Sequence, residues 1–292
     1  MRGMTTLTMQ DGCRLHLQRW PAEGPVRGTV QIVPGLGEHI GRYAGVAAAL
    51  NAAGWDVAGH DHRGHGQSQG PRGTVPPGPG LLQDLGEVVD ALRGTGSHVL
   101  LGHSMGGLVV ARFVAEGLHP VPAAWWRQVD GLVLSSPALD AGLGAAQRLL
   151  LAVLGNLAPD LRVSNGLQPA WVSRDPAVVL DYSRDPLNHD RVTPRLVRFI
   201  VDGGAEVLRQ APRWTLPTLL LWAGADRCVA PTGSAAFVAA APAAVLTAQA
   251  FAGLYHEIFN EPERELVLSH LSRWLARFPA SAPAPTHQEP PP

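Results

Sequence analysis

The feature that most constrains this chain is the five-residue stretch Gly-His-Ser-Met-Gly at positions 102–106. A short apolar run, 98–101, precedes it, and a helix-like run, 107–114, follows it. This order predicts a buried strand, a sharp turn and a helix. A serine on such a strand-to-helix turn is the pattern of a nucleophile elbow, so we expect Ser104 to be a nucleophile.

The glycines on either side of this serine fit the steric demands of the turn. Backbone angles at the nucleophile are unfavourable, so the turn closes only if the positions two before and two after it lack a Cβ atom. Gly102 and Gly106 meet this requirement. The turn also directs the backbone N–H of Met105, at the start of the helix, toward the place where an oxyanion would form. We predict that Met105 supplies one oxyanion donor.

Strand-like and helix-like stretches alternate through the first part of the chain. An Asp-Gly turn between two short runs predicts a β-hairpin over residues 5–20. Further strands are predicted at 28–33, 55–59, 98–101 and 131–135, with helices at 43–53, 81–92 and 107–114. Strands that alternate with helices predict an α/β fold with a mostly parallel central sheet flanked by helices.

The alternation stops between residues 137 and 214, where we find helical segments and no convincing strand. Asp175 and Thr193 each precede a proline, as a capping residue does at the start of a helix. Strands resume at 218–222 and near 245–248, and a last amphipathic helix spans 262–278. We therefore predict a core in two parts, 1–136 and 215–278, with a helical cap or lid, 137–214, inserted between them. A disordered Pro/Ala-rich tail, 279–292, follows.

The first predicted helix of the insertion, 145–157, has Arg148 as its only charged residue. Two interpretations stay open. A helix packed on all sides has such a composition, and so does a lid whose apolar face meets a lipid-like substrate or a membrane surface. The second interpretation predicts a transient contact of the cap with a membrane or micelle.

Composition excludes several classes of protein. Hydrophobic residues make up 46% and charged residues 16%, as in a compact globular enzyme. The chain contains no lysine, and its 23 basic residues are scattered arginines, so no nucleic-acid partner is expected. Two cysteines, Cys13 and Cys228, are too few for a disulfide framework. Because no apolar run has membrane-spanning length and none follows the N-terminus, we expect a cytoplasmic protein.

A serine hydroxyl is a strong nucleophile only when a base takes its proton, and a third group must orient that base. Asp226 follows the strand 218–222 by a few residues, through a glycine turn. His256 lies after the final strand and before the closing helix. The order Ser104, Asp226, His256 is the Ser…Asp…His order of α/β-hydrolases. We predict that these residues form a catalytic triad that needs no cofactor and no metal.

Other residues compete for these roles. Asp140 follows the strand 131–135, where some hydrolases of this fold carry their acid, so it stays an alternative to Asp226. Glu257 adjoins His256, but sequence neighbours rarely face each other in triad geometry, and we expect Glu257 at the surface. Five histidines gather near the predicted sheet edge without the spacing of a zinc site, so we expect them to hydrogen-bond loops: His39, His60, His62, His65 and His103.

The second oxyanion donor in this architecture comes from the loop after an earlier strand. Residues 34–37, Pro-Gly-Leu-Gly, occupy that loop directly after the strand 28–33. We predict that the backbone N–H of Leu36 is this donor. The loss of one donor in such a hole typically lowers turnover by about 10²- to 10³-fold.

Several stretches together resemble the monoacylglycerol lipase and lysophospholipase-like branch of the α/β-hydrolases, which are serine aminopeptidase-type hydrolases. The resemblance covers nearly the whole chain. The branch's patterns H-G-x-G-E-H-x-x-R-Y, D-x-R-G-H-G-x-S and G-H-S-M-G-G are similar to residues 35–43, 61–68 and 102–107. Further similar stretches lie within the insertion and after the last strand, at 173–176, 180–187 and 256–261.

This resemblance implies the α/β-hydrolase fold and hydrolysis of esters with a single acyl chain, such as monoacylglycerol or a similar lipid. It implies Ser104, Asp226 and His256 as the triad. It also implies Leu36 and Met105 as the oxyanion donors. No oligomeric state follows from it.

The chain departs from the branch at Pro34, where the branch usually has histidine. Proline fixes its own φ and lacks an N–H, so we expect a different support for this loop and an altered substrate range. A lysophospholipase and an amidase or proline-iminopeptidase-like peptidase are alternative activities, because the same triad serves those bonds. A catalytically silent binding scaffold is the alternative outside the enzymes.

Overall fold

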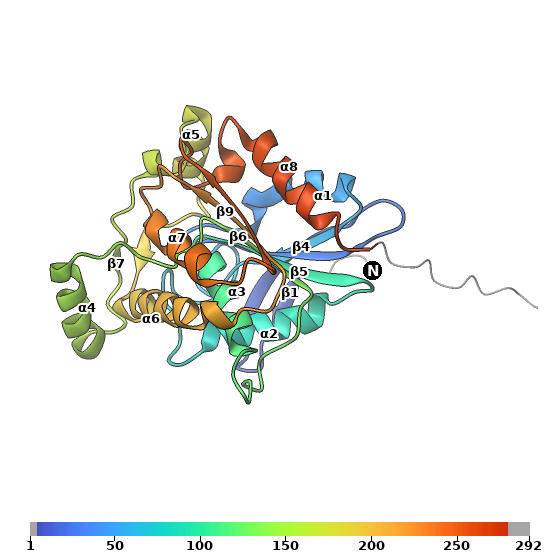
Figure 1. Cartoon of the computed structure of the whole chain (residues 1–292). Helices are drawn as coiled ribbons and strands as arrows, with labels where there is room; N and C mark the ends of the chain where they lie inside the picture. Colours follow the sequence, from blue (N-terminus) through green and yellow to red (C-terminus); the bar gives the residue numbers. More distant parts are fainter. Residues whose placement is uncertain (1–4, 280–292) are drawn as a thin grey trace, which may run out of the picture.

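The computed structural model describes residues 5–279, which form an 8-stranded sheet in the order β1-β2-β4-β3-β5-β6-β9-β10 (Figure 1). β1 pairs antiparallel with β2, and β2 pairs antiparallel with β4, whereas the remaining neighbours are parallel. The predicted hairpin and mostly parallel α/β sheet are therefore confirmed. The strands are β1 (Thr6–Thr8), β2 (Arg14–Trp20), β3 (Gly28–Val33), β4 (Asp56–His60), β5 (Ser97–His103), β6 (Gly131–Ser135), β9 (Thr218–Ala223) and β10 (Leu246–Phe251).

Helices cover both faces of this sheet (Figure 1). Successive side chains of a strand point to opposite faces, so Leu100 joins the core under one set of helices while Val99 and Leu101 join the other. The first face carries α2 (Gly80–Leu92), α3 (Met105–Glu116), α6 (Pro194–Gln210) and α7 (Pro231–Ala240). The second face carries α1 (Ala44–Ala52) and α8 (Arg264–Leu275).

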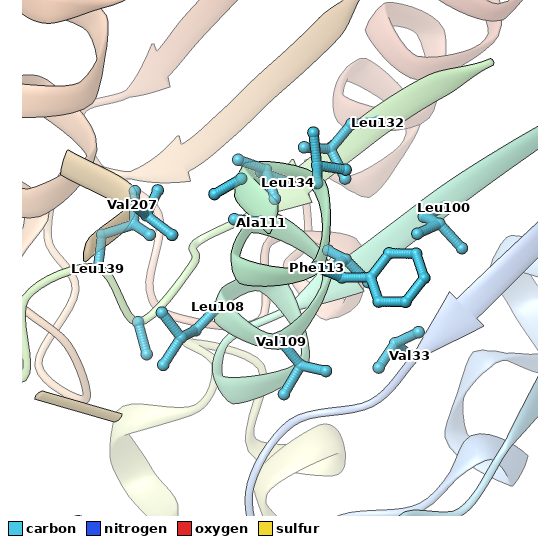
Figure 2. Close-up of a cluster of buried hydrophobic side chains, with 14 of the residues drawn as sticks. Val33, Leu100, Leu108, Val109, Ala111, Phe113, Leu132, Leu134, Leu139 and Val207 are labelled. Atoms are coloured by element: carbon cyan, nitrogen blue, oxygen red, sulfur yellow. The ribbon is translucent and has the colours of Figure 1, made fainter. Parts of the chain in front are cut away.

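α3 is the most thoroughly buried of these helices, because it lies between the sheet and α6. Figure 2 shows Phe113 of α3 directed toward Val33 and Leu100 of the sheet, with Leu108 and Val109 on the neighbouring turn. Burial of an apolar side chain of this size typically stabilises the folded state by about 1.5–3 kcal/mol. The beginning of α3, which immediately follows Ser104, is therefore held firmly against the sheet.

The segment between β6 and β9 contains the helices that the sequence predicts there. Asp175 and Thr193 cap α5 and α6 as predicted, because their side chains accept the N–H groups of Ala177 and Leu196. The expectation that this segment has no strand is wrong, since two short strands pair there; runs this short have no recognisable period. Besides α6, the segment comprises α4 (Ala145–Leu157), β7 (Val163–Ser164), η2 (Pro169–Trp171), α5 (Pro176–Arg184), β8 (Arg191–Val192) and η3 (Ala211–Arg213).

α4 lies at the periphery of the molecule, away from the sheet (Figure 1). None of its residues is buried, and Leu149, Leu150 and Leu157 are 68%, 57% and 81% exposed. The interpretation of a helix packed on all sides is therefore wrong. Within residues 5–279, no helix has the length and hydropathy needed to cross a bilayer. The predicted tail is 279–292, and all of it except Pro279 lies outside the described residues.

Candidate active site

Ser104 occupies the turn between β5 and α3 with φ 54° and ψ −121°. A positive φ is unfavourable for a residue with a Cβ atom, so the surrounding packing must hold this conformation. A Cβ atom on Gly106 would lie 2.0 Å from the carbonyl oxygen of Val33, and one on Gly102 would lie 2.4 Å from that of Gly106. The predicted need for glycine at both positions is confirmed.

His256 lies within hydrogen-bonding distance of both other residues predicted for the triad. His256 Nε2 lies 2.8 Å from Ser104 Oγ, and His256 Nδ1 lies 2.7 Å from Asp226 Oδ2. The other carboxylate oxygen of Asp226 accepts the N–H groups of Cys228 and Val229 at 2.8 and 3.1 Å. With Nδ1–H donated to Asp226, Nε2 is free to accept the serine proton, which is the geometry of a general base.

Electrostatics at this pair favour an ionised acid and a readily protonated base. Burial opposes ionisation of Asp226, but His256 and the two backbone N–H groups outweigh it, so the pKa of Asp226 lies below its usual range. Burial likewise disfavours the imidazolium of His256. The charge and hydrogen bond of Asp226, with the charges of Glu257 and Glu38, raise the pKa of His256 above 6.5.

This pKa predicts the pH dependence of the reaction. Only the neutral imidazole can take a proton from Ser104, so acidification through the raised pKa of His256 removes the base. We expect kcat/KM to fall about tenfold for each pH unit on the acid side, with a midpoint above 6.5. The measurement is kcat/KM on a soluble nitrophenyl ester between about pH 8 and about pH 5; a flat profile over this range contradicts the prediction.

The two predicted oxyanion donors border the same site. The N–H of Leu36 meets no acceptor among residues 5–279, and Met105 is the first residue of α3, where N–H groups have no partner within the helix. The loop that carries Leu36 passes close to the nucleophile, since a Cβ atom on Gly35 would lie 3.1 Å from Ser104 Cβ. Both N–H groups are thus available to a substrate oxygen near Ser104.

Two side chains support the oxyanion loop, residues 34–37, through hydrogen bonds to its backbone. His62 Nε2 donates to the carbonyl oxygen of Pro34 at 3.0 Å, and Glu38 Oε1 accepts the N–H of Gly35 at 2.5 Å. Burial and the neighbouring His60 lower the pKa of His62 to about 3, so its ring stays neutral near neutral pH. The sequence alone did not identify His62 or Glu38 as supports of this loop.

The two acidic competitors behave differently in the structure. The carboxylate of Asp140 accepts the N–H of Gly142 at 2.9 Å and the hydroxyl of Thr232 at 3.2 Å, and His256 is not among its partners. The surface position expected for Glu257 is wrong. Glu257 is buried and forms an ion pair with Arg42 at 2.6 Å.

The clustered histidines mostly hydrogen-bond loops, as predicted. Their partners are the Asp185 carboxylate for His39, the Pro34 carbonyl for His62, the Arg63 carbonyl for His65 and Ser135 for His103. His60 is the exception, because neither of its ring nitrogens has a partner within residues 5–279. Its ring packs edge-on against that of His62, with 5.3 Å between centroids.

Metal binding is a second chemistry to test at this site, because Asp226, Cys228 and His256 carry ligand atoms within 4.8 Å of one another. A metal needs the thiolate of cysteine and unprotonated, unengaged ligand atoms. Burial and the charge of Asp226 raise the pKa of the Cys228 thiol, and Asp226 and His256 already bond each other. The donor set therefore fits proton transfer better than metal coordination.

A cavity of about 470 Å³ opens onto Ser104 and His256. This volume lies within the range of roughly 300–1,000 Å³ that is usual for ligand sites. Much of its wall is apolar and comes from the segment between β6 and β9, through Leu143, Leu167, Val172, Val197 and Ile200. A serine hydroxyl, an imidazole within hydrogen-bonding distance of it and two N–H groups without acceptors thus lie at an apolar cavity, which is an arrangement suited to acyl transfer from an apolar substrate.

Comparisons with known proteins agree with this chemistry. Residues 24–263 match the family described as "Serine aminopeptidase, S33". The chain is 35% identical over 277 residues to a monoacylglycerol lipase of Mycolicibacterium smegmatis, covering 90% of this chain and 93% of that protein. It is 30% identical over 250 residues to phospholipase YtpA of Bacillus subtilis, covering 84% and 93%. The crystal structure of a Paleococcus ferrophilus monoacylglycerol lipase superposes with a TM-score of 0.81 at 35% identity, covering 91% and 99%.

Proposed function

Because the chain belongs to the monoacylglycerol lipase-like branch of the serine aminopeptidase S33 family, we propose that it hydrolyses carboxylic esters of a single acyl chain. It is a carboxylic ester hydrolase with the α/β-hydrolase fold. The observation that carries the proposal is the 2.8 Å separation between His256 Nε2 and Ser104 Oγ at an apolar-walled cavity. Monoacylglycerols are the substrates we expect first.

In the proposed reaction, Ser104 Oγ attacks the ester carbonyl carbon while His256 Nε2 takes the hydroxyl proton. The N–H groups of Leu36 and Met105 stabilise the negative oxygen of the tetrahedral intermediate. His256 then gives its proton to the leaving alcohol, and an acyl group remains on Ser104. Water, deprotonated by His256, releases the fatty acid, and Asp226 keeps the imidazole in the required tautomer throughout.

We propose that residues 137–214 act as a cap over the active site. Most of the apolar residues that line the cavity belong to this segment, so an acyl chain bound there would contact it. The segment is also tied to the loops around Ser104: His39 pairs with Asp185 at 2.8 Å, and His189 N donates to the Gly37 carbonyl at 2.9 Å. These contacts connect the cap directly to the oxyanion loop.

The exposed leucines of α4 predict that the cap contacts the substrate's aggregate, a micelle or a membrane. Burial of a leucine in an apolar phase contributes about 1.5–3 kcal/mol, so each Leu→Gln change at Leu149, Leu150 or Leu157 should weaken binding to long-chain vesicles by roughly tenfold. Hydrolysis of a soluble short-chain ester should stay unchanged. The measurement is vesicle co-sedimentation together with both hydrolysis rates.

Val121 supplies the matched control for this prediction, because it is 84% exposed and lies outside α4. Val121→Gln should leave vesicle binding unchanged. Equal losses in the Val121 and α4 variants would contradict the assignment of the contact to α4.

The cytoplasm is the compartment we propose. Cys13 and Cys228 are both free, as a reducing compartment would leave them. A disulfide-linked species in freshly isolated protein would argue against this location.

A panel of substrates tests the proposed specificity. Glyceryl and nitrophenyl esters of short to long chain are compared with a lysophospholipid and a prolyl amide at equal enzyme concentration. We expect the highest kcat/KM on a monoacylglycerol. The lysophospholipid represents the alternative that the phospholipase relative suggests, and the prolyl amide represents the alternative that the family description suggests. A higher kcat/KM on either of them would overturn the proposed specificity and leave the proposed triad unchanged.

A further inference from the structure

Three charged side chains with little exposure lie beside the active site and take no part in the proposed proton transfers: Glu38, Arg42 and Glu257. Their side chains are 5%, 11% and 7% exposed. Glu38 directly follows the oxyanion loop, and Arg42 lies in the short helix η1 (Ile40–Tyr43) just beyond it. Glu257 directly follows His256. Two of the three charges therefore adjoin, in the sequence, a group that the proposed reaction uses, and Arg42 bonds both of them.

Glu38 fixes the oxyanion loop through its carboxylate. Its Oε1 accepts the N–H of Gly35 at 2.5 Å and the hydroxyl of Tyr43 at 2.6 Å, and its Oε2 accepts from Arg42 at 2.9 Å. The bond to Gly35 orients the residue that precedes Leu36. A change in the Glu38 carboxylate would consequently turn the peptide that presents the Leu36 N–H.

Arg42 connects this carboxylate to the histidine loop. Its Nη1 and Nη2 donate to the two oxygens of Glu257 at 2.6 and 2.7 Å, which is a bidentate contact between residues 215 positions apart. Glu257 is fixed further by Asn260, whose amide donates to it at 2.9 Å. The Arg42 guanidinium also lies over the ring of Tyr182 in α5, 4.7 Å from its centroid.

The two loops joined in this way belong to distant strands of the sheet. The oxyanion loop follows β3 and the His256 loop follows β10, and β5, β6 and β9 lie between these strands. Groups from both loops must nevertheless act on one substrate carbonyl group at Ser104. A displacement of such a group by about 1 Å can lower the rate by about 10²-fold. A rigid connection across the sheet edge would maintain this geometry.

Stability alone is a weak explanation for this cluster. Buried ion pairs can often be replaced by apolar residues of similar volume without loss of stability, because the desolvation of the charges is costly. The cluster also has a charge excess, since Glu38 and Glu257 are two carboxylates for one guanidinium. That excess lies near His256 and favours its protonated form, which arises when Ser104 attacks.

We propose that Arg42 is a positioning residue: by holding Glu38 and Glu257 together, it fixes the oxyanion loop and the His256 loop relative to Ser104. This inference rests on the proposed ester hydrolysis at Ser104. In this proposal Arg42 does not contact the substrate. Replacement of Arg42 should therefore lower kcat and leave KM nearly unchanged.

The test uses Arg42→Met, Arg42→Lys and Glu257→Gln in the full chain, with kcat and KM measured on a soluble nitrophenyl ester. Glu261→Gln is the matched control, because Glu261 is also a buried glutamate in an ion pair with an arginine, Arg174, at 2.5 Å. Thermal unfolding is measured for each variant, so that kcat and KM are compared at a temperature at which all the variants are folded. The labelling rate of Ser104 by a fluorophosphonate is measured in parallel.

We expect Arg42→Met to lower kcat by about 10²-fold with KM within about twofold of wild type. Arg42→Lys should recover only part of this loss, since an ammonium cannot form the fork to a carboxylate. The double variant Arg42→Met/Glu257→Gln should have a kcat no lower than that of Arg42→Met alone, because both changes break the same Arg42–Glu257 contact. Glu261→Gln should stay within about twofold of wild type once folded.

The pH profile gives a readout that a merely structural role would not move. His256 faces Asp226, the Cys228 thiol, the His103 ring at 4.7 Å and the charges of Glu257 and Glu38. Glu257→Gln changes the charge of only one of these groups, Glu257 itself. Removal of its negative charge should lower the pKa of His256 and move the acid limb of kcat/KM to lower pH.

Wild-type kcat in folded Arg42→Met, or a raised KM with unchanged kcat, would overturn the inference. An unmoved acid limb in Glu257→Gln would also count against it. If Arg42→Met does not fold, Arg42→Lys and Glu257→Gln decide the question. A wild-type protein that hydrolyses no ester and is not labelled at Ser104 would instead refute the proposed function, so the two failures are distinguishable.

Discussion

Replacement of Ser104 with alanine is expected to lower kcat on a monoacylglycerol by about 10⁴- to 10⁶-fold while the protein keeps its fold. The hydroxyl is the only group lost, and in the proposed mechanism its oxygen forms the covalent bond to the acyl group. Alanine and serine are similarly unfavourable at φ 54°, so the change neither adds nor relieves backbone strain. The measurements are kcat, thermal unfolding and labelling by a fluorophosphonate, which should disappear.

Ser136 offers a matched control for this variant. It is also buried and also has a positive φ, 40°, but its hydroxyl accepts the N–H of Ala223 and does not contact His256. Ser136→Ala should keep its turnover and its labelling. Substantial activity in folded Ser104→Ala would contradict the assignment of the nucleophile.

Asp226→Asn is expected to lower kcat by about 10⁴-fold. The amide can donate to His256 Nδ1, which stabilises the tautomer that carries its proton on Nε2. That tautomer cannot accept the proton of Ser104. Loss of the negative charge should also lower the pKa of His256, so the residual activity should extend to lower pH.

Asp140→Asn tests the alternative acid in the same experiment. Asp140 bonds Gly142 and Thr232, so we expect its replacement to leave kcat within about threefold of wild type. Thermal unfolding of both variants shows whether any loss comes from the fold. Normal turnover in Asp226→Asn together with a large loss in Asp140→Asn would reverse the assignment of the acid.

Features governed by local sterics could be predicted from the sequence. Gly102 and Gly106 are required by a turn that leaves no room for a Cβ atom, and this requirement is visible in the residues themselves. Asp175 and Thr193 precede prolines and cap helices for equally local reasons. The strand runs were recognisable because their apolar residues are continuous, as buried parallel strands demand.

Features that depend on distant partners could not be predicted in this way. The burial of Glu257 depends on Arg42, which lies 215 positions away, and no local pattern reports that pairing. The bond from His62 to the Pro34 carbonyl depends on how two loops meet at one sheet edge. α4 illustrates a second limit, because a helix with a single charged residue has the same composition whether it is buried in a core or exposed to a lipid phase.

The most direct test of the central claim is to trap the acyl-enzyme. The protein is mixed with a monoacylglycerol, quenched in acid and digested with trypsin, which cleaves only at arginine in this lysine-free chain and releases residues 94–112 as one peptide. We predict that this peptide gains the mass of the acyl group and that fragmentation places it on Ser104. Continued turnover with the acyl group on another residue, or with no acylated peptide in folded and active protein, would contradict the account.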